Sequence, residues 1–131
     1  MNNNRLLPRL SWVQGDAEEL PFRTASFHWV LMNGVFNLFP EKRRLLREVA
    51  RVLKTGGTLV AADLIRIGPP PSEAMDEPAG WAWCLSGAED ESSIKSMFTD
   101  TGFVDVRFFS RAHEAACYWR AVFTARKKDS R

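Results

Sequence analysis

The sequence predicts an α/β domain with a strand, a helix and a strand at its centre and an antiparallel strand pair at its C-terminal end. Two almost continuously apolar runs, at 27–32 and 58–62, are typical of strands that are buried on both faces. Between them, apolar residues recur at helical steps of three and four. After residue 103 the pattern changes to alternation, which favours strands with one exposed face.

The first half of the chain holds the strand–helix–strand unit. A short strand over 10–13 is expected to end at Gly15. The run at 27–32, interrupted only by His28, is expected to be a central strand. A helix should start after Pro40 and stop before Gly56, and because 58–62 is again a buried strand, the two strands should be parallel. The apolar residues of that helix are Leu45, Leu46, Val49, Val52 and Leu53.

The second half begins with a segment that proline interrupts. The loop over about 67–80 holds Pro69, Pro70 and Pro71, which favour an extended and exposed chain. A short helix is expected around 94–98 and should stop at Gly102. The alternating segments 104–108 and 117–124 should pair antiparallel around a turn at 111–114, at the edge of the sheet.

Length and composition indicate one domain, over 1–131, with a core of its own. Hydrophobic residues make up 45% and charged residues 26%, as in globular proteins, and no apolar run approaches the roughly 20 residues that cross a bilayer. The N-terminal residues lack the apolar stretch of a secretory signal, and two cysteines make a poor disulfide framework. We therefore expect a cytoplasmic protein without a membrane segment.

Positive charge is unevenly distributed, although the net charge is only +2. The basic helix face could hold phosphate, or it could be a solvated face among interleaved acidic residues. Because no aromatic platform accompanies the basic tail, nucleic-acid binding is not expected. The basic residues are Lys42, Arg43, Arg44, Arg47, Arg51 and Lys54 in the helix and Arg126, Lys127, Lys128 and Arg131 in the tail.

Three segments carry a family resemblance. Residues 15–22 read GDAEELPF, residues 26–33 read SFHWVLMN and residues 48–63 read EVARVLKTGGTLVAAD. In order and spacing they resemble the middle of the class I S-adenosylmethionine-dependent methyltransferases, and the resemblance extends from Trp12 to Lys127. It implies a truncated Rossmann-like methyltransferase sheet that lacks the N-terminal glycine-loop half, because the eight glycines include no Gly-x-Gly.

The resemblance also implies where S-adenosylmethionine would bind. Asp16 matches the carboxylate that accepts a hydrogen bond from the adenine amino group, and Ala17 would present its backbone N–H to the ring. The alternative is that Asp16 only caps a turn that ends a strand. At the end of the strand 27–32, contact with the cofactor or substrate competes with a simple turn into a loop. The cofactor-binding residues expected in this way are Gly15, Asp16, Ala17, Phe22, Met32 and Asn33.

Within the family, arsenite methyltransferases are the most similar members. Residues 33–57 resemble their post-strand segment, and residues 81–88, WAWCLSGA, resemble their Trp-x-x-Cys-x-x-Gly-Ala stretch. Cys84 matches a cysteine that binds trivalent arsenic in those enzymes, whereas Gly34 replaces the partner cysteine. A thiophilic centre needs two or three thiolates, and Cys117 is expected to be buried in a strand, so arsenic chemistry is not expected here. The substrate-side residues are Gly34, Trp81 and Cys84.

These observations predict a truncated methyltransferase without autonomous activity, which binds S-adenosylmethionine weakly or not at all. No catalytic or metal-ligating residue is assigned. One alternative is an enzyme that homodimerisation or a partner chain completes, and another is a non-catalytic binding module. Because the family's first strand is absent, the strand from Phe27 to Met32 should have an open edge. We expect a homodimer through this edge, with fold-back of 10–13 into the gap as the alternative.

Overall fold

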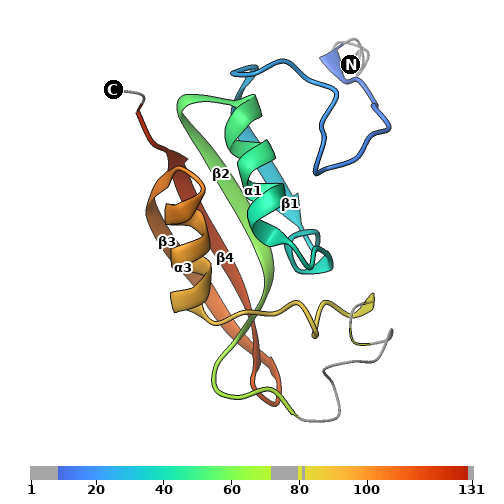
Figure 1. The fold of residues 1–131 in the computed structure, drawn as a ribbon. Coiled ribbons are helices and arrows are strands. Elements are labelled where there is room, and N and C mark those ends of the chain that lie inside the picture. The colour runs from blue at the N-terminus through green and yellow to red at the C-terminus, as the bar shows by residue number, and fades with distance from the viewer. Residues whose placement is uncertain (1–8, 72–79, 81, 130–131) are drawn as a thin grey trace, which may run out of the picture.

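The computed structural model describes residues 9–71, 80 and 82–129. They form one four-stranded sheet in the order β1-β2-β4-β3, in which β1 and β2 are parallel and β4 is antiparallel to both of its neighbours (Figure 1). This arrangement confirms the predicted α/β class and the C-terminal strand pair. The elements are β1 (Phe27–Asn33), η3 (Phe36–Leu38), α1 (Lys42–Val52), β2 (Leu53–Arg66), α3 (Glu91–Asp100), β3 (Phe103–Ala115) and β4 (Tyr118–Lys127).

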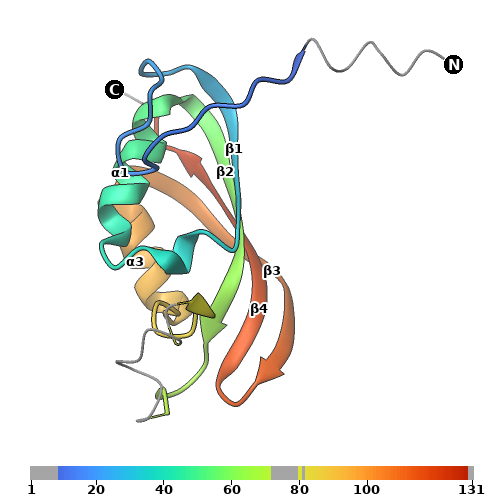
Figure 2. The same ribbon diagram turned by 90° about the vertical axis from the view of Figure 1, so that its right-hand side faces the viewer.

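The core lies between the helices and one face of the sheet. Both α1 and α3 cover the same face, as Figure 2 shows. The buried side of α1 is the apolar stripe that the sequence predicts, and α3 contributes Ile94 and Phe98. Four phenylalanines, all almost fully buried, form the centre of the core with ring centroids 5.3–6.1 Å apart: Phe36, Phe98, Phe103 and Phe123.

The environment of β1 differs from the prediction. β1 is the edge strand of the described sheet, which agrees with the open edge expected there. The sequence also indicates a strand that is covered on both faces, and this part of the prediction is wrong. Val30 and Met32 pack against the core, whereas Trp29 is 61% and Leu31 75% exposed. The physical reason is that both helices lie on one side, so no helix among the described residues covers the other face of the strand. An apolar run indicates that the side chains of a strand favour burial, but it does not reveal which element, if any, covers each face of the strand.

Two further predictions about strands are wrong. Residues 10–13 form no strand, and Trp12 is 95% exposed. A short apolar segment becomes a strand only where it can pair with another strand, and this segment pairs with none that the structure describes. The turn between the last two strands lies after Ala115 and not at 111–114, since β3 continues through several irregularities in its pairing with β4. Cys117 is therefore a half-buried residue of the turn and not of a strand.

The remaining elements agree with the sequence more closely. β2 is longer than the expected 58–62, because the chain enters it directly from α1 at Leu53. After β2 the described part of the proline segment, 67–71, has no helix or strand, and 72–79 lie outside the described residues. No helix in the described part of the chain is long and apolar enough to span a membrane.

Candidate functional site

The segment 15–26, which carries the expected adenine contacts, begins with a tight turn. Asp16 Oδ1 accepts a hydrogen bond from the Glu18 N–H at 2.8 Å, and the Asp16 carbonyl accepts one from the Glu19 N–H at 3.1 Å. Gly15 lies so close to Pro21 that a Cβ atom would stand 3.0 Å from the proline Cδ. The turn-capping alternative is thus what one oxygen of Asp16 does.

Two groups of this turn keep free hydrogen-bonding capacity. Among the described residues, Asp16 Oδ2 and the Ala17 N–H have no hydrogen-bond partner. Asp16 is exposed, whereas Ala17 is half-buried and its methyl group packs against the core. An acceptor and a donor therefore stand on neighbouring residues at the surface. This pairing matches a ligand that presents an amino donor beside a ring-nitrogen acceptor.

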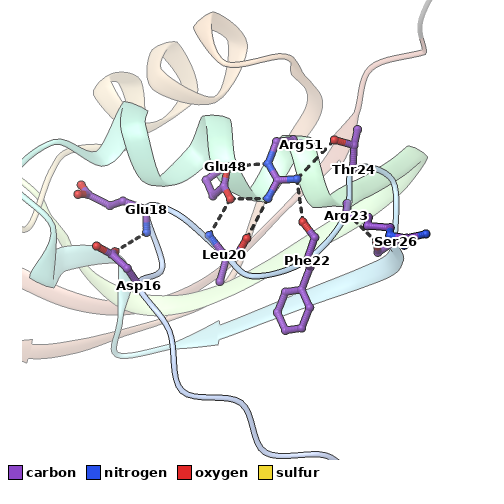
Figure 3. Close-up of polar contacts among 9 residues, drawn as sticks. All are labelled: Asp16, Glu18, Leu20, Phe22, Arg23, Thr24, Ser26, Glu48 and Arg51. Carbon is purple, nitrogen blue, oxygen red and sulfur yellow. Dashed lines mark hydrogen bonds and ion pairs between the residues drawn. The ribbon is translucent and has the colours of Figure 1, made fainter.

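Helix α1 holds the segment through an ion pair that the sequence does not reveal. Arg51 Nη2 lies 2.6 Å from Glu48 Oε1. Both side chains also form hydrogen bonds with the backbone of the segment, as the dashed lines in Figure 3 show. The hydrogen bond from Arg51 is the main reason why the pKa of Glu48 lies below its usual value, and Glu48 in turn raises the pKa of Arg51. The helix-face prediction left Arg51 solvated or phosphate-binding, and the structure gives it a third role.

The other cofactor-side residues are placed differently from one another. The Phe22 ring packs edge-on against Phe27 at a centroid distance of 5.0 Å, so it forms part of an apolar wall beside β1. Met32 is half-buried against the core. Asn33 is exposed and belongs to a separate cavity at the end of the strand. The structure thus does not gather all six predicted residues around one point.

That cavity, of about 330 Å³, opens at the carboxyl ends of β1 and β2. Ligands in open α/β sheets bind at this edge. Most of its exposed wall is apolar, and its one basic side chain, Arg120, pairs with Glu114 at 2.6 Å. The residues that line it are Asn33, Gly34, Ala62, Asp63, Leu64, Trp83, Cys84, Ser110, Arg120, Ala121 and Val122.

Two of the three predicted substrate-side residues meet in this cavity. Cys84 Sγ lies 3.9 Å from the Gly34 carbonyl oxygen, although the two residues are 50 positions apart. Burial, and then the negative charge of Asp63, raise the pKa of the Cys84 thiol, so the thiol stays protonated at neutral pH. Trp81, the third residue, lies outside the described residues.

Asp63, which lines the cavity, forms a buried polar pair with Asn37, and sequence reasoning missed both residues. Asp63 is buried and accepts hydrogen bonds from the Asn37 N–H, the Asn37 side-chain amide and the Leu64 N–H, at 3.0, 3.0 and 2.9 Å. Burial raises the pKa of Asp63, and these donors oppose the shift. The available signal was an aspartate at the end of a buried-strand run, where a charge needs donors.

Gly87, in the loop that follows Cys84, packs closely against the backbone of Asn37. A Cβ atom on Gly87 would stand 1.9 Å from the Asn37 carbonyl oxygen, so only glycine allows the two backbones to approach this closely. Asn37 therefore joins three parts of the chain: η3, the end of β2 and the loop that carries Cys84. This junction brings Cys84 to Gly34.

Comparison with known proteins identifies the fold and the family. Residues 1–61 match the family model described as a methyltransferase domain. The solved structure of an arsenic(III) S-adenosylmethionine methyltransferase from Chlamydomonas reinhardtii superimposes with a TM-score of 0.73 and 27% identity, over 91% of this chain and 44% of that one. The chain belongs to the class I S-adenosylmethionine-dependent methyltransferases. Its sheet and helices are those of the Rossmann-like methyltransferase fold.

Two curated relatives illustrate the similarity of this chain to methyltransferases. An arsenite methyltransferase of Halobacterium salinarum is 33% identical over 89 residues, which are 68% of this chain and 23% of the relative. Phthiotriol/phenolphthiotriol dimycocerosates methyltransferase 1 of Mycobacterium ulcerans is 48% identical over 82 residues, 63% of this chain and 27% of the relative. The chain thus spans about a quarter of the length of these relatives.

Proposed function

We propose that this chain provides one half of a methyltransferase site, in which the segment 15–26 receives the adenine of S-adenosylmethionine and the cavity receives the methyl acceptor. The observation that carries the proposal is the pair of free groups at Asp16 Oδ2 and Ala17 N–H, which suits the adenine edge. Family membership supports the choice of cofactor. The cavity at the strand ends supports the acceptor side.

By itself the 131-residue chain should bind the cofactor weakly and lack autonomous activity. It offers contacts to the adenine but has no Gly-x-Gly, through which the family's backbone approaches the rest of the cofactor. We expect a dissociation constant above about 1 mM, which corresponds to a binding free energy less favourable than roughly −4 kcal/mol. Methyl transfer requires the acceptor, the methyl group and the sulfur to be aligned, and a loosely held cofactor gives little such alignment.

We further propose that a second copy of the chain covers the free edge of β1. Within the described sheet β1 is paired on one side only, and Trp29 and Leu31 are exposed beside that edge. Burial of such side chains contributes about 1.5–3 kcal/mol each, and a twofold contact buries both copies of each. A dimer that also completes the cofactor site is the alternative to an inactive half-site.

The cavity favours an apolar acceptor over trivalent arsenic. One protonated thiol faces a glycine here, whereas arsenic binding requires two or three thiolates. The wall around Cys84 is mainly apolar. Similarity to the phthiotriol/phenolphthiotriol dimycocerosates methyltransferase, at 48% identity over 63% of this chain, supports an acceptor other than arsenic.

Titration with S-adenosylhomocysteine, followed by amide NMR and calorimetry, tests the cofactor half of the proposal. The expected result is a weak, saturable shift of the Ala17 amide that Asp16→Ala abolishes. Glu19→Ala is the matched control, because it removes a carboxylate from the same turn but leaves the Glu19 backbone contact in place. No shift at 16–22, or a shift that Asp16→Ala leaves unchanged, contradicts adenine binding here. Micromolar affinity that depends on Asp16 supports a completed enzyme instead of a half-site.

A further inference from the structure

A polar stripe on α1 faces the segment 15–26. Arg44, Glu48 and Arg51 follow one another at steps of four and three, which places them on one side of the helix. All three reach the segment: Arg44 lies 3.5 Å from a carboxylate oxygen of Glu18, and the other two bind backbone groups. The apolar residues that hold α1 to the sheet occupy a different side of the helix.

The side chains of Glu48 and Arg51 bind the backbone of two residues of the segment, Leu20 and Phe22. Glu48 Oε1 accepts the Leu20 N–H at 2.7 Å, and Arg51 Nη2 donates to the Leu20 carbonyl at 3.1 Å. Arg51 Nη1 donates to the Phe22 carbonyl at 2.8 Å. The two side chains also hold each other, because Arg51 Nε and Nη2 both donate to the Glu48 carboxylate, at 2.8 and 2.6 Å. This fork geometry is specific to arginine.

We infer that Glu48 and Arg51 are positioning residues, which fix the backbone at Leu20 and Phe22 on α1 and thereby fix the Asp16–Ala17 turn. Both backbone groups of Leu20, four residues after Asp16, are bound by this pair. The turn has few other anchors among the described residues, namely the Ala17 methyl group, the Glu18–Arg44 pair and the contact of Gly15 with Pro21. The link to adenine rests on the proposed function, whereas the fixation of the segment does not.

Backbone contacts make the inference specific. A guanidinium that pairs only with a carboxylate on the same helix would stabilise α1 alone. In addition to its pairing with Glu48, Arg51 donates hydrogen bonds to two carbonyl groups that lie 29 and 31 positions earlier in the chain. Removal of the side chain should therefore leave the helix and the sheet folded but free the backbone around Leu20 and Phe22 from the helix. The backbone N–H groups of Ala25 and Ser26 remain bound to carbonyl groups at the end of α1.

Amide hydrogen exchange of the full chain, with Arg51→Met compared to Arg47→Met, tests the fixation. Arg47 is an exposed residue of the same helix, and its side chain makes no hydrogen bond or ion pair with any described residue, so the control loses the same charge and gains the same side chain. We expect exchange at the Leu20 amide to rise at least about tenfold in Arg51→Met, while the amide of Leu59 in β2 stays protected. Arg47→Met should behave as the parent chain. Equal exchange at Leu20 in the two variants overturns the inference.

Two further, more conservative variants test whether the effect depends on the geometry of the Arg51 side chain. Arg51→Lys keeps the charge but cannot bridge two carbonyls while it also pairs with both carboxylate oxygens, so it should restore only part of the protection at Leu20. Glu48→Gln keeps an acceptor for the Leu20 N–H and should give an intermediate rate. Full protection in Arg51→Lys contradicts the fork geometry, because a point charge would then suffice.

The same samples, titrated with S-adenosylhomocysteine, separate this inference from the proposed function. We expect the affinity reported by the Ala17 amide to fall at least about fivefold in Arg51→Met and to stay unchanged in Arg47→Met. If exchange rises at Leu20 but the affinity is unaffected, the pair holds the segment without positioning the cofactor turn, and that part of the inference is wrong. If the parent chain shows no shift at all, the proposed function fails, and the exchange data still decide whether the pair fixes the segment.

Discussion

Replacement of Asn37 by alanine should destabilise the protein strongly, because Asn37 is a buried polar residue with several hydrogen bonds. Asn37 is fully buried in η3, and its side-chain amide donates to Asp63 Oδ1 at 3.0 Å and to the Leu64 carbonyl at 2.7 Å. Alanine removes both donors. The bond from the Asn37 backbone N–H to Asp63 Oδ2 remains, so the carboxylate keeps part of its hydrogen bonding.

The size of the effect follows from the kinds of hydrogen bond that are lost. A hydrogen bond to a charged group contributes about 1.5–3 kcal/mol and one between neutral groups about 0.5–1.5 kcal/mol. Against this, Asn37 Oδ1 is buried without a partner among the described residues, and its removal returns on the order of 1 kcal/mol. We therefore expect Asn37→Ala to lower the free energy of unfolding by about 1–3.5 kcal/mol.

Urea unfolding followed by tryptophan fluorescence measures this change, with linear extrapolation to water. Asn33→Ala is the matched control, because Asn33 is exposed at the end of β1 and its side chain makes no hydrogen bond with a described residue. The control should stay within about 0.5 kcal/mol of the parent chain. If Asn37→Ala also stays within that range at an unchanged m-value, the junction between η3 and β2 does not stabilise the fold as argued.

Four further predictions concern the packing, assembly, pH response and cavity. Gly87→Ala should lower the unfolding temperature and expose the adjacent loop to protease, because the new methyl group would stand 1.9 Å from a backbone oxygen. Light scattering behind a sizing column should give twice the chain mass of 14.9 kDa, and Leu31→Lys should give a monomer; a parent chain that is already monomeric contradicts the dimer. The pKa of Glu48 lies below its usual 4.5, so its contribution to stability is complete above that pH and is lost as the pH falls through the lowered pKa. Urea midpoints between pH 7 and pH 3 should therefore fall less in Glu48→Gln than in the parent chain. Gly34→Cys places a second thiol near Cys84, where the space around the new Cβ is open but the φ of +66° strains a side chain. It should strengthen binding of trivalent arsenic measured by tryptophan fluorescence; no gain over the parent chain means that the two thiols do not meet.

Local patterns in the sequence were sufficient to predict which of the main elements are helices and which are strands. The helical spacing of Leu45, Leu46 and Val49 predicts α1 and its buried side, and both are confirmed. Alternation predicts the last two strands, and apolar runs predict β1 and β2. The similarity of segments 15–22, 26–33 and 48–63 to methyltransferases predicts the family, because those short segments combine strand ends and turns that the fold requires together. Each of these features depends on residues that are close to one another in the sequence, so the sequence alone is enough to predict it.

Tertiary structure alone decided what each element faces. Both helices lie on one side of the sheet, so the apolar run of β1 became a half-exposed edge strand, and β3 extended beyond the expected turn because β4 offered it further pairing. The Asn37–Asp63 bonds join residues 26 positions apart, and Arg51 reaches carbonyls 29 and 31 positions away. Whether a polar side chain in such a place meets water or a backbone group depends on the path of the whole chain. Periodicity shows which side of an element is apolar, and only the packed fold shows which partner the polar side meets.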